Sequence, residues 1–380
     1  MTLVVHHIIN NIELEQGGAQ RVVRQLHSGL RQQGVASRIV AICDSADGVV
    51  DTVSLKNTSP YGWRAFVSTL QYIRQHCSPE DIIHVHLFPA LLHVSLAVRL
   101  LRWSGQLVCT EHNTSNRRRS HPMGRFIDGL VYPTYQRIYC ISQGTLDSLK
   151  RWMPDQQNKL KVVENGVKLS HGEFSSKQKT DRLVIVSAGR LHKQKNYETA
   201  IRAIALLKDL NIEYRIAGIG SEENALRAQC SHLKLEDTVK FYGYVNNIDS
   251  FLTEADIFLM PSRWEGFGLA AVEAMNAGLP VIASNVPGIR EVLDTPRPCG
   301  ILVSPDSPDE IASAVRALKH QNKRQALGKR AFMRSRCFSE ERMTERYRDE
   351  YNQLTLARNQ SFSKKDFSKK DLSKKAQEQY

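Results

Sequence analysis

Apolar residues occur in short runs that alternate with helical patterns along most of the chain. Runs rich in Val, Ile and Leu predict strands at 3–9, 37–43, 81–88, 106–112 and 137–142. Between them, apolar positions recur every three or four residues, as in AQRVVRQLHSGLRQQG at 19–34, which indicates amphipathic helices. Strands and helices in this order predict parallel βαβ units with helices on both faces of the sheet.

The pattern breaks at 170–181, SHGEFSSKQKTD, which has no hydrophobic period. It then restarts, with strands predicted at 183–190, 214–220, 239–244, 257–262, 279–284 and 300–305. We therefore predict an α/β protein with two doubly wound domains. The expected division is an N-terminal domain at 1–168, a linker at 169–181 and a C-terminal domain at 182–338.

The last 42 residues form a charged helix pattern followed by a basic tail. The helix is expected at 339–358 and to pack back toward the N-terminal domain. The tail at 359–380 carries the repeat FSKKD, FSKKD, LSKKA, whose five-residue period does not keep its apolar residues on one helical stripe. We expect it to be disordered, either as a weak membrane contact or as a dispensable segment.

The composition is that of a globular protein, with 380 residues, 41% hydrophobic and 24% charged. No run of eighteen apolar residues occurs, and the start lacks the basic and small-residue pattern of a signal peptide. The seven cysteines form no CxxC pair, which favours reduced thiols in a cytoplasmic protein over a disulfide frame or a zinc site.

Positive charge is concentrated in one part of the first domain. The net charge is +13, yet residues 1–98 are balanced, whereas 99–151 carry nine Arg and Lys against three acidic residues. Such an excess suits anionic lipid heads, a phosphorylated acceptor or nucleic acid, and solvated surface charge is the alternative. Since no nucleic-acid-binding motif accompanies the charge, we do not expect a nucleic-acid partner.

The stretch RWEGFGLAAVEAMNAG at 263–278 carries the strongest chemical signal. It follows a predicted strand, and ligands bind beyond the carboxyl ends of strands in open parallel sheets. Its glycines let backbone N–H groups approach an anion at a helix N-terminus. Glu265 in the loop and Glu273 in the helix can accept hydrogen bonds from two hydroxyl groups, which fits a nucleotide sugar. The alternative is a helix-start charge and a surface glutamate.

Two further features predict a diphosphate site between the domains. Arg190 and Lys195 lie one turn apart at a strand-to-helix junction, unless they are merely a solvated helix start. Gly17 and Gly18 let backbone N–H groups approach the same diphosphate from the first domain. The chain contains no Asp-x-Asp, the usual seat for a metal-bound nucleotide diphosphate, so neither a metal nor another cofactor is expected.

EGFGLAAVE at 265–273 resembles the E-x7-E signature of GT-B glycosyltransferases, in particular the retaining family 4. Other segments resemble the same family in its own order, from residue 3 to about 350: GGAQRVV (17–23), VVENGV (162–167), SAGRLHKQKNYETAIRA (187–203), IAGIGSEENAL (216–226) and AGLPVIASNVPGIREV (277–292). The resemblance implies a GT-B architecture, in which two Rossmann-like domains face each other across a cleft. It further implies a role in bacterial O-antigen or polysaccharide synthesis.

The resemblance also implies roles for individual residues. His112 matches a histidine that contacts the donor sugar, as a catalytic or a sugar-binding group, and Glu265 binds sugar hydroxyls. The implied route is front-face substitution, in which the leaving phosphate accepts the proton of the acceptor hydroxyl. The remaining donor-binding residues are expected to be Gly17, Gly18, Arg190, Lys195, Gly243, Tyr244, Gly266, Phe267, Gly268, Leu269 and Glu273.

The acceptor side is expected in the first domain, where the basic segment 113–126 follows His112. Its arginines, Arg117, Arg118, Arg119 and Arg125, suit a membrane surface or a lipid-linked diphosphate sugar, unless the loop is simply solvated. We therefore expect a hexosyltransferase that moves a sugar from a UDP-sugar, or a GDP-sugar, to a polyprenyl-diphosphate-linked glycan. Its expected place is the cytoplasmic face of the bacterial inner membrane.

Other protein classes share parts of these patterns. A dinucleotide oxidoreductase needs G-x-G-x-x-G after an early strand, whereas GIGSEE at 218–223 has two of the three glycines. A GT-B sugar-nucleotide epimerase and a non-catalytic sugar-nucleotide-binding protein remain alternatives. His84 and His86 share one face of a strand, but a metal site needs a third ligand and none is evident from the sequence. We expect both to line the cleft or to pack in the core.

Overall fold

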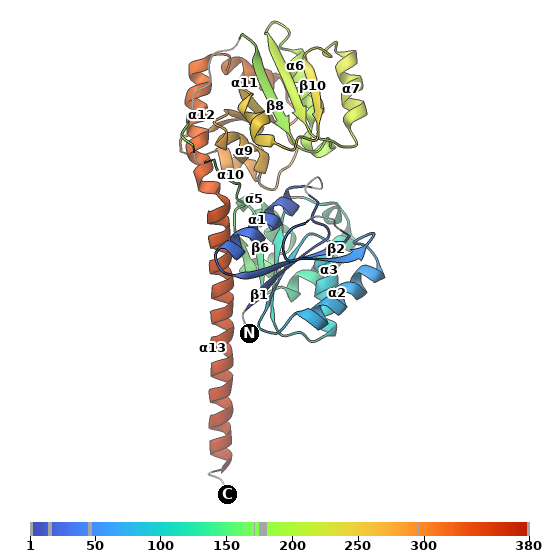
Figure 1. Cartoon of the computed structure of the whole chain (residues 1–380), viewed down its shortest axis with the longest axis vertical. Helices are drawn as coiled ribbons and strands as arrows, with labels where there is room; N and C mark the ends of the chain where they lie inside the picture. Colours follow the sequence, from blue (N-terminus) through green and yellow to red (C-terminus); the bar gives the residue numbers. More distant parts are fainter. Residues whose placement is uncertain are drawn as a thin grey trace.

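The structure is a computed structural model that describes residues 3–13, 17–44, 48–170, 172–174, 181–294 and 296–377. Two parallel sheets, each flanked by helices, lie one beyond the other along the longest axis of the molecule (Figure 1). The predicted α/β class with two doubly wound sheets is confirmed.

The N-terminal sheet has the strand order β3-β2-β1-β4-β5-β6-β7, and all its neighbouring strands are parallel. Its strands are β1 (Val4–Ile9), β2 (Ala36–Cys43), β3 (Thr52–Asn57), β4 (Ile82–His86), β5 (Gln106–Glu111), β6 (Arg137–Cys140) and β7 (Leu160–Val162). The helices are α1 (Gly18–Gln32), α2 (Trp63–His76), α3 (Ala90–Leu100), α4 (Pro122–Val131) and α5 (Gln143–Trp152). The strand order reverses between β1 and β4, where an open α/β sheet leaves a crevice for a ligand.

The C-terminal sheet has the order β10-β9-β8-β11-β12-β13, and it too is parallel throughout. Its strands are β8 (Leu183–Ala188), β9 (Ile212–Ala217), β10 (Val239–Gly243), β11 (Ile257–Met260), β12 (Val281–Ser284) and β13 (Gly300–Val303). The helices are α6 (Tyr197–Ala205), α7 (Glu223–His232), α8 (Ile248–Thr253), α9 (Leu269–Asn276), α10 (Ile289–Leu293), α11 (Pro308–Ala317) and α12 (Gln321–Ser335). The crevice of this sheet lies between β8 and β11.

Two strands of the N-terminal sheet were not predicted. β3 is half-buried along its length, and its sequence TVSLKN has a weak alternation of apolar and polar residues. β7 has only three residues, all half-buried, which is too short for a periodic signal. Both are outer strands of the sheet, where a strand depends on one neighbour and needs less apolar surface.

Helix α13 (Glu340–Gln377) returns the chain from the C-terminal domain along the N-terminal one and then extends beyond it (Figure 1). Met343, Tyr347 and Tyr351 are buried in one cluster with residues of β1, α1 and β6. A methyl group added at Gly29 of α1 would lie 2.4 Å from Oγ1 of Thr344, so the two helices touch closely there.

The expectation of a disordered tail at 359–380 is corrected as far as Gln377, because α13 is continuous to that residue. The repeat contains neither Gly nor Pro, and Lys, Gln, Ala and Leu all favour helix. A helix that is already anchored by packed tyrosines needs no new nucleus, so it extends at a low cost per residue. The five-residue period means that the helix has no continuous apolar stripe. A helix needs such a stripe only where it packs against another element, so its absence does not exclude a helix.

A layer of histidine and tyrosine side chains lies between α13 and the N-terminal sheet. Nδ1 of His84 lies 2.6 Å from the hydroxyl of Tyr351, and its Nε2 lies 2.7 Å from Oγ1 of Thr110. Four histidines are buried in this part of the sheet, and burial lowers their pKa values. The pKa of His112 is lowered to about 4. The pKa values of His7, His84 and His86 lie well below the usual range of histidine. The folded protein therefore holds all four neutral at physiological pH.

We expect acid to destabilise the protein well before its carboxylates titrate. The unfolded histidines take up protons as the pH falls through about 6.5, whereas the buried ones stay neutral, so the free energy of unfolding falls with pH. Each such histidine lowers it by roughly 1.4 kcal/mol per pH unit. Urea denaturation between about pH 7.5 and pH 5 measures this slope. It should be shallower in His84→Asn and unchanged in the control His320→Gln, which alters an exposed residue. A flat profile would contradict the prediction.

The close contact between α1 and α13 predicts that alanine at position 29 destabilises the folded protein. Gly29→Ala should lower the free energy of unfolding by about 1–3 kcal/mol, because the new methyl group displaces the Thr344 side chain. In α4 the matched change Gly129→Ala should instead raise it by about 0.5–1 kcal/mol, since that site is exposed with no neighbour within 4 Å. Chemical denaturation measures both. Adding Thr344→Ala to Gly29→Ala should recover most of the loss, and no recovery would show that the crowding is not the cause.

Candidate active site

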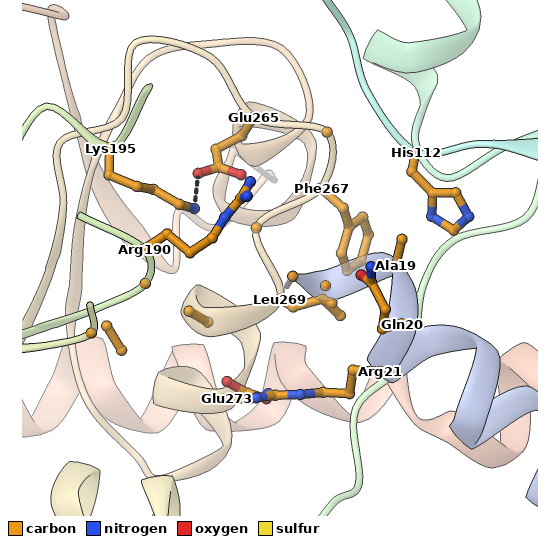
Figure 2. Close-up of a pocket in the computed structure, with 18 of the residues that line it drawn as sticks. Ala19, Gln20, Arg21, His112, Arg190, Lys195, Glu265, Phe267, Leu269 and Glu273 are labelled. Carbon is orange, nitrogen blue, oxygen red and sulfur yellow. Dashed lines mark hydrogen bonds and ion pairs between the residues drawn. The ribbon is translucent and has the colours of Figure 1, made fainter. Parts of the chain in front are cut away.

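The two crevices face each other across a cavity of about 510 Å³ between the domains. Its wall combines the start of α1 with the loops that follow β5, β8, β9, β10 and β11. Twelve of the thirteen residues predicted to be catalytic or donor-binding line it, and Figure 2 shows several of them. They are Gly17, Gly18, His112, Arg190, Lys195, Tyr244, Glu265, Gly266, Phe267, Gly268, Leu269 and Glu273.

Gly243 is the exception, because it is not among the residues that line the cavity, and its contact with the donor stays a prediction. Its carbonyl oxygen accepts a hydrogen bond from the backbone N–H of Gly218 at 2.7 Å. A side chain at Gly218 would lie 2.0 Å from the carbonyl oxygen of Gly189, so three backbone segments meet closely at this point. Gly243, with φ +63°, shapes the turn that carries Tyr244 into the cavity wall.

Glu265 is the buried carboxylate of the C-terminal wall. Its Oε1 accepts hydrogen bonds from Nζ of Lys195 at 2.6 Å and from Oγ of Ser262 at 2.7 Å. The exposed Arg190 reaches in beside this pair (Figure 2). One negative and two positive groups therefore lie together where β8 and β11 end.

Glu273 is held from the other domain by Arg21, a residue that the sequence reasoning did not single out. The Arg21 guanidinium, on the first turn of α1, forms an ion pair with the Glu273 carboxylate on α9 (Figure 2). Burial raises the pKa of Glu273, and the charge of Arg21 opposes that shift. The sequence signal was the place of Arg21 three residues after the glycine pair of GGAQRVV.

Asn165 is a second residue that the sequence reasoning passed over, although it lies in the quoted segment VVENGV. It is buried and lines the cavity. Its Oδ1 is buried without a hydrogen-bond partner in the described part of the chain. A buried acceptor of this kind suits a ligand that offers a donor.

The loop that contains Glu265 is fixed by the opposite domain. Hydroxyl groups of Ser142 and Thr145, at the start of α5, donate to the carbonyl oxygen of Gly266 at 2.6 and 3.2 Å. Thr114 donates to the carbonyl oxygen of Glu265 at 3.0 Å. A methyl group at Gly266 would lie 2.3 Å from the carbonyl oxygen of His112, so the loop touches the N-terminal backbone directly.

A carboxylate completes this contact between the domains. Glu291 on α10 accepts hydrogen bonds from the backbone N–H groups of Gln143 and Gly144 at 2.6 and 2.5 Å. These N–H groups belong to the first turn of α5, whose positive end favours a negative charge. Burial raises the pKa of Glu291, and the hydrogen bonds from Gly288, Gly144 and Gln143 oppose the shift.

His112 lies directly after β5, on the N-terminal wall of the cavity. It is 7% exposed, and its Nε2 lies 3.2 Å from Nδ1 of His86. The nitrogen that remains for a ligand is therefore Nδ1. Since burial lowers the pKa of His112 to about 4, the ring is a hydrogen-bonding group near neutral pH and carries no charge there.

The expectation that four arginines form one acceptor or membrane surface is corrected for two of them. Arg119, whose side chain is 9% exposed, forms an ion pair with Glu111 at 2.9 Å. Arg118 pairs with the buried Asp128 at 3.0 Å and covers the ring of Phe88. Both arginines therefore make contacts inside the domain. They supply the positive charges that the carboxylates of Asp128 and Glu111 need. Arg125 is exposed, and for Arg117 the structure describes the backbone alone.

The direction in which the Glu111 side chain points follows from these contacts. Its carboxylate faces into the N-terminal domain, where it also accepts a hydrogen bond from the Tyr132 hydroxyl at 2.6 Å. Burial raises the pKa of Glu111, but Arg119, Tyr132 and Arg118 outweigh that effect and leave the pKa below its usual value. Glu111 is thus an ion-paired carboxylate with a structural role, directly before His112 in the chain.

A third histidine, which the sequence could not place, joins His84 and His86. His7 of β1 pairs in register with His84 of β4, and ring nitrogens of the three residues lie within 4.8 Å of one another. Both nitrogens of His84 and both of His86 already have hydrogen-bond partners, and no carboxylate belongs to the set. A divalent cation would have to replace these bonds, so the donor set fits a hydrogen-bonded core better than a metal site.

Two family models match successive parts of the chain. The model described as Glycosyltransferase Family 4 matches residues 16–171, and the model described as Glycosyl transferases group 1 matches residues 172–334. The two ranges meet between the two sheets, and each contains part of the cavity wall.

Curated relatives and solved structures agree with the family models. The chain is 27% identical to the O-antigen biosynthesis glycosyltransferase WclY of Escherichia coli over 66% of this chain and 72% of that one. It is 25% identical to the GDP-mannose:cellobiosyl-diphosphopolyprenol alpha-mannosyltransferase of Komagataeibacter xylinus over 80% and 81% of the two chains. The crystal structure of Anabaena HepE with UDP and glucose superposes with a TM-score of 0.80, at 18% identity, over 92% of this chain and all of that one.

These likenesses bear out the resemblance in sequence and the GT-B architecture of two facing Rossmann-like domains. They also bear out the expected enzyme class. The chain belongs to the glycosyltransferases, with a Family 4 domain followed by a group 1 domain on the GT-B fold.

Proposed function

We propose that this glycosyltransferase moves a sugar from a UDP-sugar, or alternatively a GDP-sugar, to a hydroxyl of a glycan acceptor, with retention and without a metal. The observation that carries the proposal is the pairing of Lys195 with Glu265 at the cavity wall, beside Arg190 (Figure 2). The cations suit a diphosphate, and the carboxylate suits the hydroxyls of the sugar next to it.

The diphosphate would lie between the start of α1 and the cations of the C-terminal domain. α1 has fifteen residues, and the N–H groups of its first turn point to the cavity. Gly17, with φ +148°, leaves the backbone open to a close anion. As the nucleotide leaves, negative charge grows on its phosphate, and fixed donors and cations stabilise that charge. Since the chain has no Asp-x-Asp, we assign this task to Arg190, Lys195 and the helix.

The donor sugar would lie at Glu265 and the ribose at Glu273, the two glutamates of the E-x7-E signature. Glu265 and Glu273 are the carboxylates among the residues that line the cavity. Glu265 would accept hydrogen bonds from hydroxyls of the donor sugar, and Glu273 would share its oxygens between Arg21 and the ribose. With no second carboxylate placed as a nucleophile in this set, we favour front-face substitution, in which the leaving phosphate accepts the acceptor proton.

The relatives suggest the pathway and the acceptor. The Escherichia coli relative is named for O-antigen biosynthesis, and the Komagataeibacter relative for a diphosphopolyprenol acceptor. We extend this to the present chain as a polyprenyl-diphosphate-linked glycan in cell-surface polysaccharide assembly. Such an acceptor would place the enzyme on the cytoplasmic face of the inner membrane.

An exposed apolar patch on α3 and α4 supports that placement. The two helices touch, and they present large apolar side chains with 45% to 66% exposure: Leu96, Leu100, Met123, Phe126 and Leu130. Arg99 on α3, Arg102 just after it and Arg125 on α4 are exposed as well. Apolar side chains among arginines suit an anionic bilayer surface. In the described residues, no helix has the length and apolar character needed to cross a bilayer.

Calorimetry with UDP and GDP in EDTA tests the donor site. One nucleotide should bind wild type, and Lys195→Ala should weaken it by about tenfold to a hundredfold, the loss of a charge-assisted hydrogen bond. The control Lys193→Ala removes an exposed lysine outside the cavity wall, and it should bind like wild type. A nucleotide that binds with magnesium but not with EDTA would overturn the metal-free site. No binding of either nucleotide would overturn the donor assignment.

Vesicle flotation tests the membrane contact. Wild type should float with vesicles that contain anionic lipid, and the double variant Met123→Ser with Phe126→Ser should lose most of this binding. Met333→Ser on α12 is the matched control, because Met333 is 64% exposed on the other domain. Equal flotation of all three proteins, or none by wild type, would contradict the contact.

A further inference from the structure

Three buried histidines form a continuous row from the cavity into the core of the N-terminal sheet. His112 follows β5, His86 ends β4 and His7 lies in β1, so the row crosses three neighbouring strands. Nε2 of His112 lies 3.2 Å from Nδ1 of His86, and Nε2 of His86 lies 3.2 Å from Nδ1 of His7. We call these three residues the histidine row.

The row fixes the protons of its members relative to one another. A neutral imidazole has one N–H donor and one bare acceptor nitrogen. Each contact in the row needs one donor and one acceptor, so the choice made at one end decides the choice at the other. All three rings are neutral, because burial lowers their pKa values.

Two proton arrangements satisfy both contacts. In the first, every ring carries its proton on Nδ1, and His112 offers an N–H to the cavity. In the second, every ring carries its proton on Nε2, and His112 offers a bare nitrogen. They differ in the core at Nε2 of His7, which is buried without a hydrogen-bond partner in the described part of the chain. The second arrangement would leave an N–H donor unpaired there.

The first arrangement is the better one. A buried N–H without an acceptor is rare in proteins, and leaving one unpaired costs about 1–3 kcal/mol. The first arrangement leaves a bare ring nitrogen in the core and keeps every ring proton of the row either hydrogen-bonded or facing the cavity.

We propose that His86 and His7 are positioning residues, which hold His112 in the Nδ1–H form so that it donates a hydrogen bond to a hydroxyl oxygen of the donor sugar. The identity of that ligand rests on the function proposed above, whereas the arrangement of the row does not. His112 then acts as a neutral hydrogen-bond donor whose N–H has a fixed direction, and the proposal involves no change in its charge.

Nitrogen-15 NMR of the histidine-labelled full chain, without ligand and near neutral pH, tests the row directly. In wild type, the proton of His112 should be on Nδ1 and its Nε2 should be bare. In His86→Asp, a carboxylate oxygen stands where Nδ1 stood and can only accept a hydrogen bond, so the proton of His112 should move to Nε2. In His86→Asn, the amide nitrogen stands where Nδ1 stood, as many bonds from Cα, and should restore the wild-type form.

His84→Asn is the matched control, since His84 is equally buried on the same strand but bonds to Tyr351 and Thr110. It should leave the His112 proton on Nδ1. If His86→Asp does not fold, His7→Asp against His7→Asn gives the same comparison one residue further along the row. A proton on Nε2 of His112 in wild type, or a proton that stays on Nδ1 in the aspartate variants, would overturn the proposal.

Kinetics separate this proposal from the proposed function. With a UDP-sugar or GDP-sugar that is turned over, kcat/KM should fall about tenfold to a hundredfold in His86→Asp and be close to wild type in His86→Asn, as for the loss and return of one hydrogen bond. The predicted NMR pattern without turnover of any nucleotide sugar would sustain the row and reject the proposed donor. Normal kcat/KM in His86→Asp, despite a moved proton, would reject the positioning role.

Discussion

The active site depends on two backbone carbonyl oxygens of the C-terminal domain that are held by hydroxyl groups of the N-terminal domain. Ser142 and Thr145 bind the carbonyl of Gly266, and Thr114 binds that of Glu265. Through these contacts the buried carboxylate of Glu265 takes its place opposite the start of α1. The shape of a cavity between two domains depends on the contacts that fix the distance between the domains. Here such contacts are made by the loop that carries Glu265.

Glycine is what allows so close a contact. A side chain at Gly266 would collide with the backbone of His112, and one at Gly288 would lie 2.7 Å from the carbonyl oxygen of Glu265. The motif that the sequence displays as E-G-F-G therefore has two tasks. Its glutamate lines the cavity, while Gly266 lets the backbone of the opposite domain touch the loop.

The sequence predicted the features that depend on local chemistry. The two doubly wound sheets, the glycine pair before α1, the cations after β8 and the paired glutamates each have a signal within a short segment. It could not predict what depends on register between distant segments. His7 meets His84 because β1 and β4 pair, and Arg21 meets Glu273 because the two domains face each other. Charge alone also misled, since Arg118 and Arg119 look like surface residues until Asp128 and Glu111 are found beside them.

The chain passes between the domains twice, and the two passages touch. Val167, on the way out, pairs with Ser339, on the way back, through hydrogen bonds of 2.9 Å from Val167 to Phe338 and from Glu340 to Val167. These paired segments lie side by side at the start of α13, so a rotation of one domain relative to the other would have to bend both at this one place. A surface that held the outer part of α13 and the N-terminal domain would therefore leave such a rotation to the C-terminal domain.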